Sequence, residues 1–246
     1  MRELRIVHLY PDLLRTYGDR GNITVLTRRA SLRGIAASVV AVSRGDHMPD
    51  RADLIFIGGG SDRVQTAVGS DLLARRERIC DLVSDGCVVL GVCGGYQLLG
   101  SSYLARSGPV EGIGLLDVRT VAGAGRIVGL TRATHPPFSP PLPLIGFENH
   151  AGRSWLGPGA TPLGRVARGS GNNGIDRTDG AVNGRVFGTY LHGPVLALNP
   201  AFADHLLSLI IGSDLAPLPD DVERTARREW PGARWKRLSL TALRRG

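Results

Sequence analysis

The segment CVVLGVCGGYQLLG, residues 87–100, combines two kinds of pattern. Residues 87–92 are apolar or small, as a buried central strand requires, and helical spacing of apolar side chains resumes after two glycines. Cys93 therefore lies at a strand-to-helix junction, and Gly94 and Gly95 permit the tight turn that such a junction needs. This pattern is typical of a nucleophile elbow, and the alternative is a buried cysteine that only packs.

A nucleophilic cysteine needs further groups, and the sequence offers candidates for them. The N-terminus of the following helix favours the thiolate, and the Gly94 amide would point at an oxyanion formed by attack of Cys93. The segment IFIGGGSD (55–62) also ends a strand in glycines, at the same edge of a parallel sheet, so its amides could complete an oxyanion hole. His192, in GTYLHGP (188–194), follows another short β run and is a candidate general base, although a lone histidine is more often structural.

Strand and helix patterns alternate on both sides of Cys93. The predicted strands are 4–10, 36–43, 52–60 and 87–95, and the predicted helices are 23–34, 64–86, 95–104 and 199–212. This alternation predicts an α/β fold with a mostly parallel sheet covered by helices on both faces. Residues 112–193 are rich in glycine, proline and short β-like runs, which predict strand pairs and surface loops of the same domain. Two loops are expected there: 135–143, too rich in proline to pair in a sheet, and 169–180, a flexible connection or a hairpin near a site.

Composition narrows the class of protein. The 246 residues are 42% hydrophobic, with no apolar run of membrane-spanning length and no signal-peptide pattern at the N-terminus, so we expect a cytoplasmic protein. Three cysteines and six scattered histidines show neither a disulfide framework nor metal-ligand spacing, and there is no Walker-type phosphate loop. Neither a metal nor a cofactor is therefore expected.

The net charge of +8 is concentrated at the C-terminus. Residues 221–246 carry eight basic and three acidic side chains, and we interpret this stretch as a solvated tail, with an acidic partner or membrane surface as a weaker alternative. We therefore predict one domain over residues 1–212 and a basic C-terminal extension over 213–246.

The ordered motifs resemble a known family. GVCGGYQLLG, with IGGGSD before it and YLHGP after it, resembles class I (triad-type) glutamine amidotransferases of the cobyric-acid-synthase-like branch, whose fold is flavodoxin-like. The stretches YPDLLRTYGDRGN, GFENHAGR and LHGPVLALNP are similar to one family in that branch. That family is the glutaminase subunit, GatD, of lipid II isoglutaminyl synthase, and the resemblance covers roughly residues 4–212.

The resemblance implies a role for particular residues. Cys93 matches the nucleophile that attacks the side-chain amide of L-glutamine, and His192 matches the base. Gly59 and Gly94 match the oxyanion-hole positions. Further positions match substrate-binding residues of the family or lie in loops near its site: Gln97, Arg126 and Asn149. Ordinary structural roles explain these three almost as well, as an exposed helix residue, a surface arginine and part of a β-turn.

One position departs from the class I pattern. A glutamate that orients the histidine is usual two residues after it, but this chain has Pro194 there, and no nearby carboxylate in the sequence replaces it. We therefore expect a carboxylate from a partner subunit to complete the site. In the resembling system that partner is a Mur-ligase-like, MurT-type synthetase, which carries the ATP-dependent step and acts on membrane-bound lipid II. The complex would bring the chain to the inner face of the membrane.

Three other interpretations are open on the sequence. The first is an amidotransferase subunit for a cobyrinate-type acceptor, and the second is a stand-alone γ-glutamyl cysteine hydrolase. The third is a non-enzymatic module that binds nucleotides or nucleic acid. The sequence disfavours the third, because the GGG run is not a GxGxxG motif and the basic tail lacks interleaved aromatic residues. A nucleic-acid partner is therefore not expected.

Overall fold

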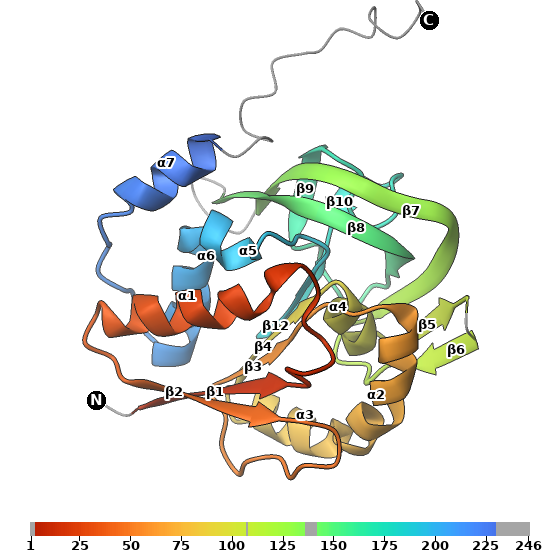
Figure 1. Ribbon diagram of the computed structural model, residues 1–246, viewed down its shortest axis with the longest axis horizontal. Helices are drawn as coiled ribbons and strands as arrows, with labels where there is room; N and C mark the ends of the chain where they lie inside the picture. Colours follow the sequence, from red (N-terminus) through yellow and green to blue (C-terminus); the bar gives the residue numbers. More distant parts are fainter. Residues whose placement is uncertain (1–2, 107, 136–141, 230–246) are drawn as a thin grey trace, which may run out of the picture.

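The computed structural model describes residues 3–106, 108–135 and 142–229. Within these residues the chain forms two six-stranded β-sheets, with helices packed around the first (Figure 1). The strand order of the first sheet is β11-β12-β4-β3-β1-β2, and all its pairings are parallel except that of β11 with β12. Its strands are β1 (Leu4–Leu9), β2 (Ala37–Val42), β3 (Leu54–Ile57), β4 (Val88–Val92), β11 (Ala181–Asn183) and β12 (Val186–Thr189).

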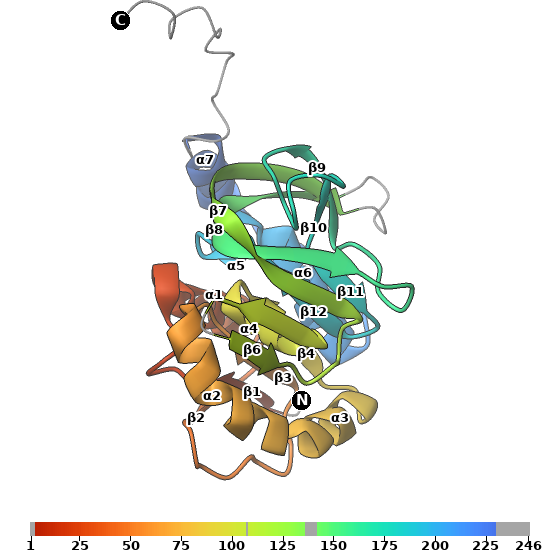
Figure 2. The same cartoon turned by 90° about the vertical axis from the view of Figure 1, so that its right-hand side faces the viewer.

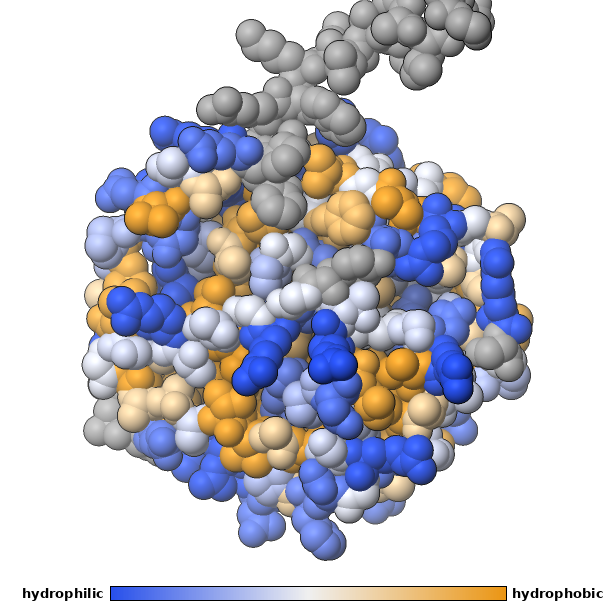
Figure 3. Space-filling model, viewed as in Figure 1, coloured by the Kyte–Doolittle hydropathy of each residue, from blue (hydrophilic) through white to orange (hydrophobic). Residues whose placement is uncertain are grey.

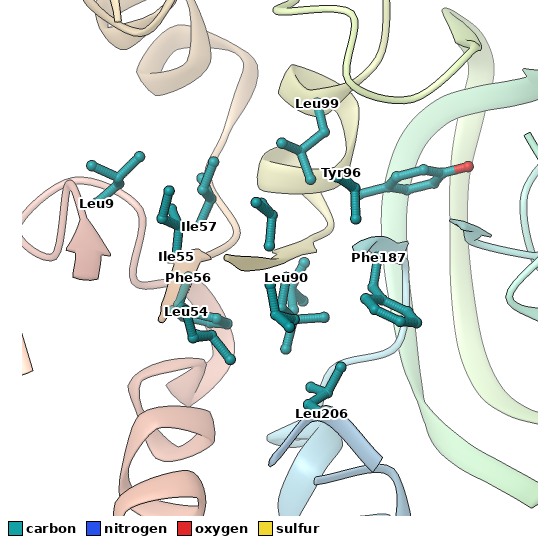
Figure 4. Packing of buried hydrophobic residues seen from close by; sticks show 14 of the residues in the cluster. Leu9, Leu54, Ile55, Phe56, Ile57, Leu90, Tyr96, Leu99, Phe187 and Leu206 are labelled. Atoms are coloured by element: carbon teal, nitrogen blue, oxygen red, sulfur yellow. The ribbon is translucent and has the colours of Figure 1, made fainter. Parts of the chain in front are cut away.

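Helices cover both faces of this sheet, which confirms the predicted α/β class. One face carries α1 (Arg20–Ser31), α5 (Val195–Leu198) and α6 (Pro200–Ile211), and the other carries α2 (Asp62–Ala74), α3 (Arg76–Ser84) and α4 (Gly94–Leu99). Figure 4 shows Leu90 of the central strand β4 between the side chains of α4 and Leu206 of α6. Because β3 and β4 are buried on both faces, they consist of near-continuous apolar runs, as the sequence predicts.

Two predicted helices differ from the observed ones. The helix predicted over 64–86 is two helices that meet at Arg75, whose side chain turns inward to bond Asp71 and the carbonyl of Ser43. The helix predicted over 95–104 ends at Leu99, and the chain enters β5 instead, because Gly100 adopts an extended conformation. Both predictions were wrong because apolar residues keep a helical spacing in the sequence even where the chain changes direction and the helix ends.

The second sheet is the largest difference from the expected fold. It contains β5 (Ser102–Ala105), β6 (Gly108–Glu111), β7 (Val118–His135), β8 (Leu142–Leu156), β9 (Gly164–Arg168) and β10 (Thr178–Asp179). The long antiparallel ribbon of β7 and β8 arches over the first sheet (Figure 2). The strands predicted over 112–193 thus divide between two sheets, since β7 to β10 belong to this second sheet and β11 and β12 to the first. Part of the predicted proline loop is also paired, since Pro143 lies opposite Thr134, and residues 136–141 lie outside the described part.

The start of the predicted C-terminal extension is attached to the body. Asp220 accepts a hydrogen bond from Arg29 of α1 at 2.7 Å, and Arg227 donates to the carbonyl of Pro143 at 2.9 Å. Arg227 belongs to α7 (Asp221–Glu229), which buries none of its residues, and Figure 3 shows hydrophilic and hydrophobic side chains side by side around its position at the upper left. The boundary at 212/213 stays a prediction, and residues 230–246 lie outside the described part.

In the described residues, no helix combines the length and the apolar character that a membrane crossing requires.

Close backbone contact between β3 and α4 leads to a test of stability. A Cβ on Gly95 would overlap the carbonyl oxygen of Ile57, which belongs to the neighbouring strand and cannot rotate away. We expect Gly95→Ala to lower the free energy of unfolding by about 1–3 kcal/mol, measured by urea denaturation. Gly125→Ala is the matched control, because a Cβ there has no atom within 4 Å. Equal stability of both variants would contradict this packing.

Candidate active site

Three parallel strands end at one edge of the first sheet, and their following segments form the site. In the register of the sheet, Gly91 of β4 lies opposite Ile57 of β3, and Val92 lies opposite Thr189 of β12. The residues after these strands are Cys93, the glycine run 58–60 and the segment that carries His192. This meeting of strand ends places the predicted nucleophile, base and glycine loop in one region.

The turn at Cys93 has the geometry of a nucleophile elbow. Cys93 has φ 51° and ψ −103°, in a region that non-glycine residues rarely adopt, and it is 7% exposed. Its backbone amide donates to the carbonyl of Thr189 at 2.8 Å, which holds the strained residue against β12. The alternative of a cysteine that only packs does not explain this strain, because a cysteine can pack in an apolar core with an unstrained backbone.

His192 is held in the buried centre of the site. Its backbone exchanges two hydrogen bonds with Phe147 of β8, so the second sheet positions it. Burial acts to lower the pKa of His192, but hydrogen bonds and charges from Asp19 and Cys93 outweigh burial and raise its pKa to about 10. The imidazole therefore interacts with the Cys93 thiol on one side and with a carboxylate on the other.

That carboxylate corrects the expectation that no acid of this chain serves His192. The Nδ1 atom of His192 lies 3.0 Å from Oδ1 of Asp19, and both side chains are completely buried. Asp19 precedes α1 and is 173 residues away in sequence, so a search near the histidine does not find it. Pro194 packs instead against Gly21 at the start of α1. The structure removes the reason for assigning this carboxylate to a partner subunit.

The loop that carries Asp19 is attached to the glycine run by two hydrogen bonds. The amide of Thr16 donates to the carbonyl of Gly59 at 3.1 Å, and the amide of Gly59 donates to Oδ2 of Asp19 at 2.8 Å. The second bond corrects the predicted role of Gly59, because its amide is occupied by the triad carboxylate and does not face an oxyanion. Gly59 has to be glycine for a further reason, since a Cβ there would lie 2.9 Å from Cε1 of His192.

The other predicted oxyanion donor, Gly94, lies at the start of α4. The glycine run passes very close to it, so that a Cβ on Gly94 would be 2.8 Å from the amide nitrogen of Gly60. The amide nitrogen of Gly60 thus lies close to Gly94, the residue that follows Cys93.

A pocket of about 260 Å³ opens at Cys93. This volume lies just below the roughly 300–1,000 Å³ of pockets for drug-sized ligands, so it suits a small metabolite. Its lining combines the glycine run, the start of α2, the cysteine turn and the β7–β8 ribbon: Thr16, Gly60, Ser61, Asp62, Gln65, Cys93, Gln97, Arg126, Asn149, His150 and Ala151. The described residues hold no cluster of three or more His, Cys, Asp or Glu side chains suited to a metal ion.

Arg126 and Asn149 form one unit in the wall of the pocket. Nε of Arg126 donates to the side-chain oxygen of Asn149 at 2.7 Å, and Nη2 donates to its backbone carbonyl at 2.8 Å. That same carbonyl lies 4.0 Å from Sγ of Cys93. The predicted substrate-binding residues are therefore near the nucleophile, with Asn149 orienting a cationic side chain at the pocket.

Gln97 lies on the inner wall of the pocket in a buried network. Its Nε2 donates to the hydroxyl of Tyr190 at 3.0 Å, and its Oε1 accepts from Gln65 at 2.8 Å. The ring of His150 stacks on Tyr190 with centroids 3.5 Å apart, and burial lowers the pKa of His150 to about 4, which keeps it neutral at physiological pH. The structure thus corrects the alternative of Gln97 as an exposed helix residue, because only 3% of it is exposed.

Sequence reasoning missed Gln65 and the role of Asp19. Gln65 shares a helical face with the buried residues Val68 and Leu72, at spacings of three and seven. A polar side chain on the core-facing stripe of a helix is a signal that could have identified it. Asp19 offers no comparable signal, since an aspartate in a turn-rich stretch such as YGDRGN (17–22) is explained by ordinary turn chemistry.

A thiol that interacts with an imidazole, which in turn interacts with a carboxylate, can attack an amide to form a thioester and can then hydrolyse that thioester. The doubly covered parallel sheet and the cysteine turn at its edge define the class of protein as class I glutamine amidotransferases. Residues 5–200 match the CobB/CobQ-like glutamine amidotransferase domain, and the chain belongs to that family.

Curated relatives and solved structures agree with this assignment. The chain is 39% identical over 209 residues to the lipid II isoglutaminyl synthase (glutamine-hydrolyzing) subunit GatD of Staphylococcus aureus, covering 84% of each chain. It is 38% identical to the subunit GatD of Streptococcus pneumoniae, covering 84% of this chain and 80% of that one. A cobyric acid synthase of Methylobacterium nodulans is 38% identical over 170 residues, but the chain spans only 32% of it. The fold resembles PurLQS from Thermotoga maritima, with a TM-score of 0.58 at 18% identity over 86% of this chain and 99% of that one.

Proposed function

We propose that this chain is the glutaminase subunit of a lipid II isoglutaminyl synthase. It hydrolyses L-glutamine to glutamate and ammonia, and the ammonia passes to a Mur-ligase-like, MurT-type partner that amidates the D-glutamate of lipid II. The observation that carries the proposal is the contact of buried Asp19 with His192, whose imidazole interacts with Cys93, the residue at which a pocket of amino-acid size opens. The similarity to GatD subunits over 84% of the chain supports the acceptor.

The proposed reaction uses the side chains in sequence. The Cys93 thiolate attacks the side-chain carbonyl carbon of glutamine, and the developing oxyanion accepts hydrogen bonds from the Gly94 amide and the Gly60 amide. The imidazolium of His192 gives a proton to the nitrogen, the C–N bond breaks, and ammonia leaves behind a γ-glutamyl thioester. His192 then takes a proton from water, the hydroxide attacks the thioester, and glutamate leaves as the thiolate returns.

Two neighbouring groups support these steps. Asp19 accepts a hydrogen bond from the Nδ1–H group of His192, which directs Nε2 toward the sulfur and stabilises the imidazolium. Arg126 binds the α-carboxylate of the substrate, because a guanidinium oriented by Asn149 presents paired donors to a carboxylate. We further propose that the chain works in the cytoplasm, at the membrane face through the complex.

The deciding experiment is reconstitution with the Mur-ligase-like partner. The complex receives ATP, lipid II and glutamine labelled with ¹⁵N in its side-chain amide, and mass spectrometry follows the label. We expect ¹⁵N in the stem peptide as D-isoglutamine. Cys93→Ala is the control, which should lose transfer from glutamine but retain amidation with added ammonium chloride.

The two enzymatic alternatives predict different results in the same assay. Transfer of the label to a corrinoid acid in place of lipid II would favour the cobyrinate-type subunit. Partner-independent hydrolysis of γ-glutamyl peptides, without transfer to lipid II, would favour the stand-alone hydrolase. The coverage of only 32% of the cobyric acid synthase argues against the first of these.

A further inference from the structure

Gln65 on α2 lines the pocket, and the orientation of its side-chain amide is determined by its neighbours. Its Nε2 lies 3.3 Å from the carbonyl of Gly60 and 2.8 Å from Oε1 of Gln97, and the residue is 1% exposed. A backbone carbonyl can only accept, so the NH₂ end of the Gln65 amide has to face Gly60. The opposite end, Oε1, is therefore the acceptor end.

That acceptor has no protein partner within the described part of the chain. Oε1 of Gln65 is buried and makes no hydrogen bond there, although the residue lines the same pocket as Cys93. A buried acceptor without a donor is unfavourable, and in a pocket it indicates the place of a donor group on the ligand. Nothing in the proposed reaction at Cys93 uses this atom.

The network around Gln65 gives Gln97 a different role from the expected one. Both ends of the Gln97 amide are engaged inside the protein, one with Gln65 and the other with Tyr190. Gln97 therefore acts as a positioning residue, which holds the NH₂ end of Gln65 and leaves its oxygen without a protein partner within the described residues.

Charges in the pocket wall indicate which donor group that oxygen meets. Asp62 lies three residues before Gln65 at the start of α2, lines the pocket, and accepts from the hydroxyl of Tyr103 at 2.9 Å. The β7–β8 ribbon contributes Arg126 to the same pocket. A carboxylate and an amide oxygen on one element and a guanidinium on another suit a zwitterion, with its ammonium at α2 and its carboxylate at Arg126.

We propose that Gln65 accepts a hydrogen bond from the α-ammonium of glutamine, with Asp62 supplying the compensating charge. This assignment rests on the proposed glutaminase function and adds the group that selects an α-amino acid. A ligand with the same side-chain amide but no amino group leaves Oε1 unpaired and gains nothing from Asp62.

The test compares two substrates in the same variants. We use the full chain in its complex and measure ammonia release from L-glutamine and from 4-carbamoylbutanoate, which is glutamine without its α-amino group. Loss of a hydrogen bond to a charged group predicts that Gln65→Leu raises the KM for glutamine by about tenfold to a hundredfold. The change in kcat should be smaller, and kcat/KM for 4-carbamoylbutanoate should stay within about twofold.

A second variant and a control complete the design. Asp62→Asn should also raise the KM for glutamine selectively, while Thr66→Ala, an exposed position of the same helix, should leave both substrates unchanged. Equal losses for both substrates in Gln65→Leu would overturn the proposal, because the side chain would then only maintain the shape of the pocket. Failure of the unmodified complex to hydrolyse glutamine would overturn the proposed function and this assignment together. This outcome differs from failure of the assignment alone, in which the unmodified complex is active and only the variants give the wrong result.

Discussion

Replacing Cys93 with alanine is expected to abolish glutamine hydrolysis, with a loss in kcat of at least about 10⁴-fold. The reason is chemical, since the thioester cannot form without the sulfur, and the remaining hydrogen-bond donors bind glutamine without a nucleophile to attack it. Ammonia release from glutamine in the full complex, followed with a coupled glutamate assay, measures the effect.

The strain at this position provides the control for folding. Cys93 has φ 51°, which glycine adopts without a steric penalty, so Cys93→Gly should be at least as stable as the unmodified chain and equally inactive. An inactive variant of undiminished stability shows that the chemistry has been lost and the fold kept. Residual activity of Cys93→Ala within tenfold of the unmodified chain would refute the assignment of this residue as nucleophile.

Replacing Asp19 with asparagine is expected to lower kcat by about a hundredfold to ten-thousandfold, as removing the charge of a triad carboxylate does elsewhere. The carboxylate is buried with His192, and its oxygens bond Nδ1 of His192 and the amide of Gly59. An asparagine has nearly the same shape but no charge. Its NH₂ end cannot accept a hydrogen bond, so either Nδ1 of His192 or the amide of Gly59 loses its acceptor. The change therefore acts mainly on the imidazole.

The pH profile distinguishes this role from a purely structural one. His192 has a pKa of about 10, above its ordinary value of 6.5, because Asp19 and Cys93 outweigh the opposing effect of burial. The imidazolium that protonates the leaving nitrogen is thus present up to about pH 10, and the stability contributed by its interactions is complete below pH 6.5 and lost as pH rises through 10.

In Asp19→Asn burial is opposed less strongly, so the pKa of His192 falls and the alkaline limb of kcat/KM should move to lower pH. Measurement of kcat/KM across this range tests the prediction, with Asp46→Asn as an exposed control. An unchanged alkaline limb in Asp19→Asn would show that Asp19 does not tune the histidine.

Because the carboxylate that bonds His192 is Asp19 of this chain, a partner subunit would not need to supply one. Because Asp19 belongs to the loop before α1, any movement of that loop changes the histidine and the glycine run together. A partner subunit that touches this loop would therefore affect catalysis without contributing a side chain to it.

Local pattern was sufficient for the central part of the fold. The runs that became β3 and β4 were predicted because strands buried on both faces have to be continuously apolar, and that property is visible in a few neighbouring residues. The glycines around Cys93 likewise indicated a tight turn, since only small residues fit where strand and helix backbones meet. The sequence by itself thus determined the α/β class, the cysteine elbow and the sheet edge where the site lies.

Tertiary structure alone decided which groups meet at that edge. The contact between Asp19 and His192, the occupied amide of Gly59 and the orientation of the Gln65 amide depend on hydrogen bonds between segments far apart in the chain. Residue spacing carries information on the direction of a strand or helix, but a side chain's hydrogen-bond partner depends on how loops pack in three dimensions. For that reason the site's location was readable from the sequence, while its acid and the residue we propose for the substrate's amino group were not.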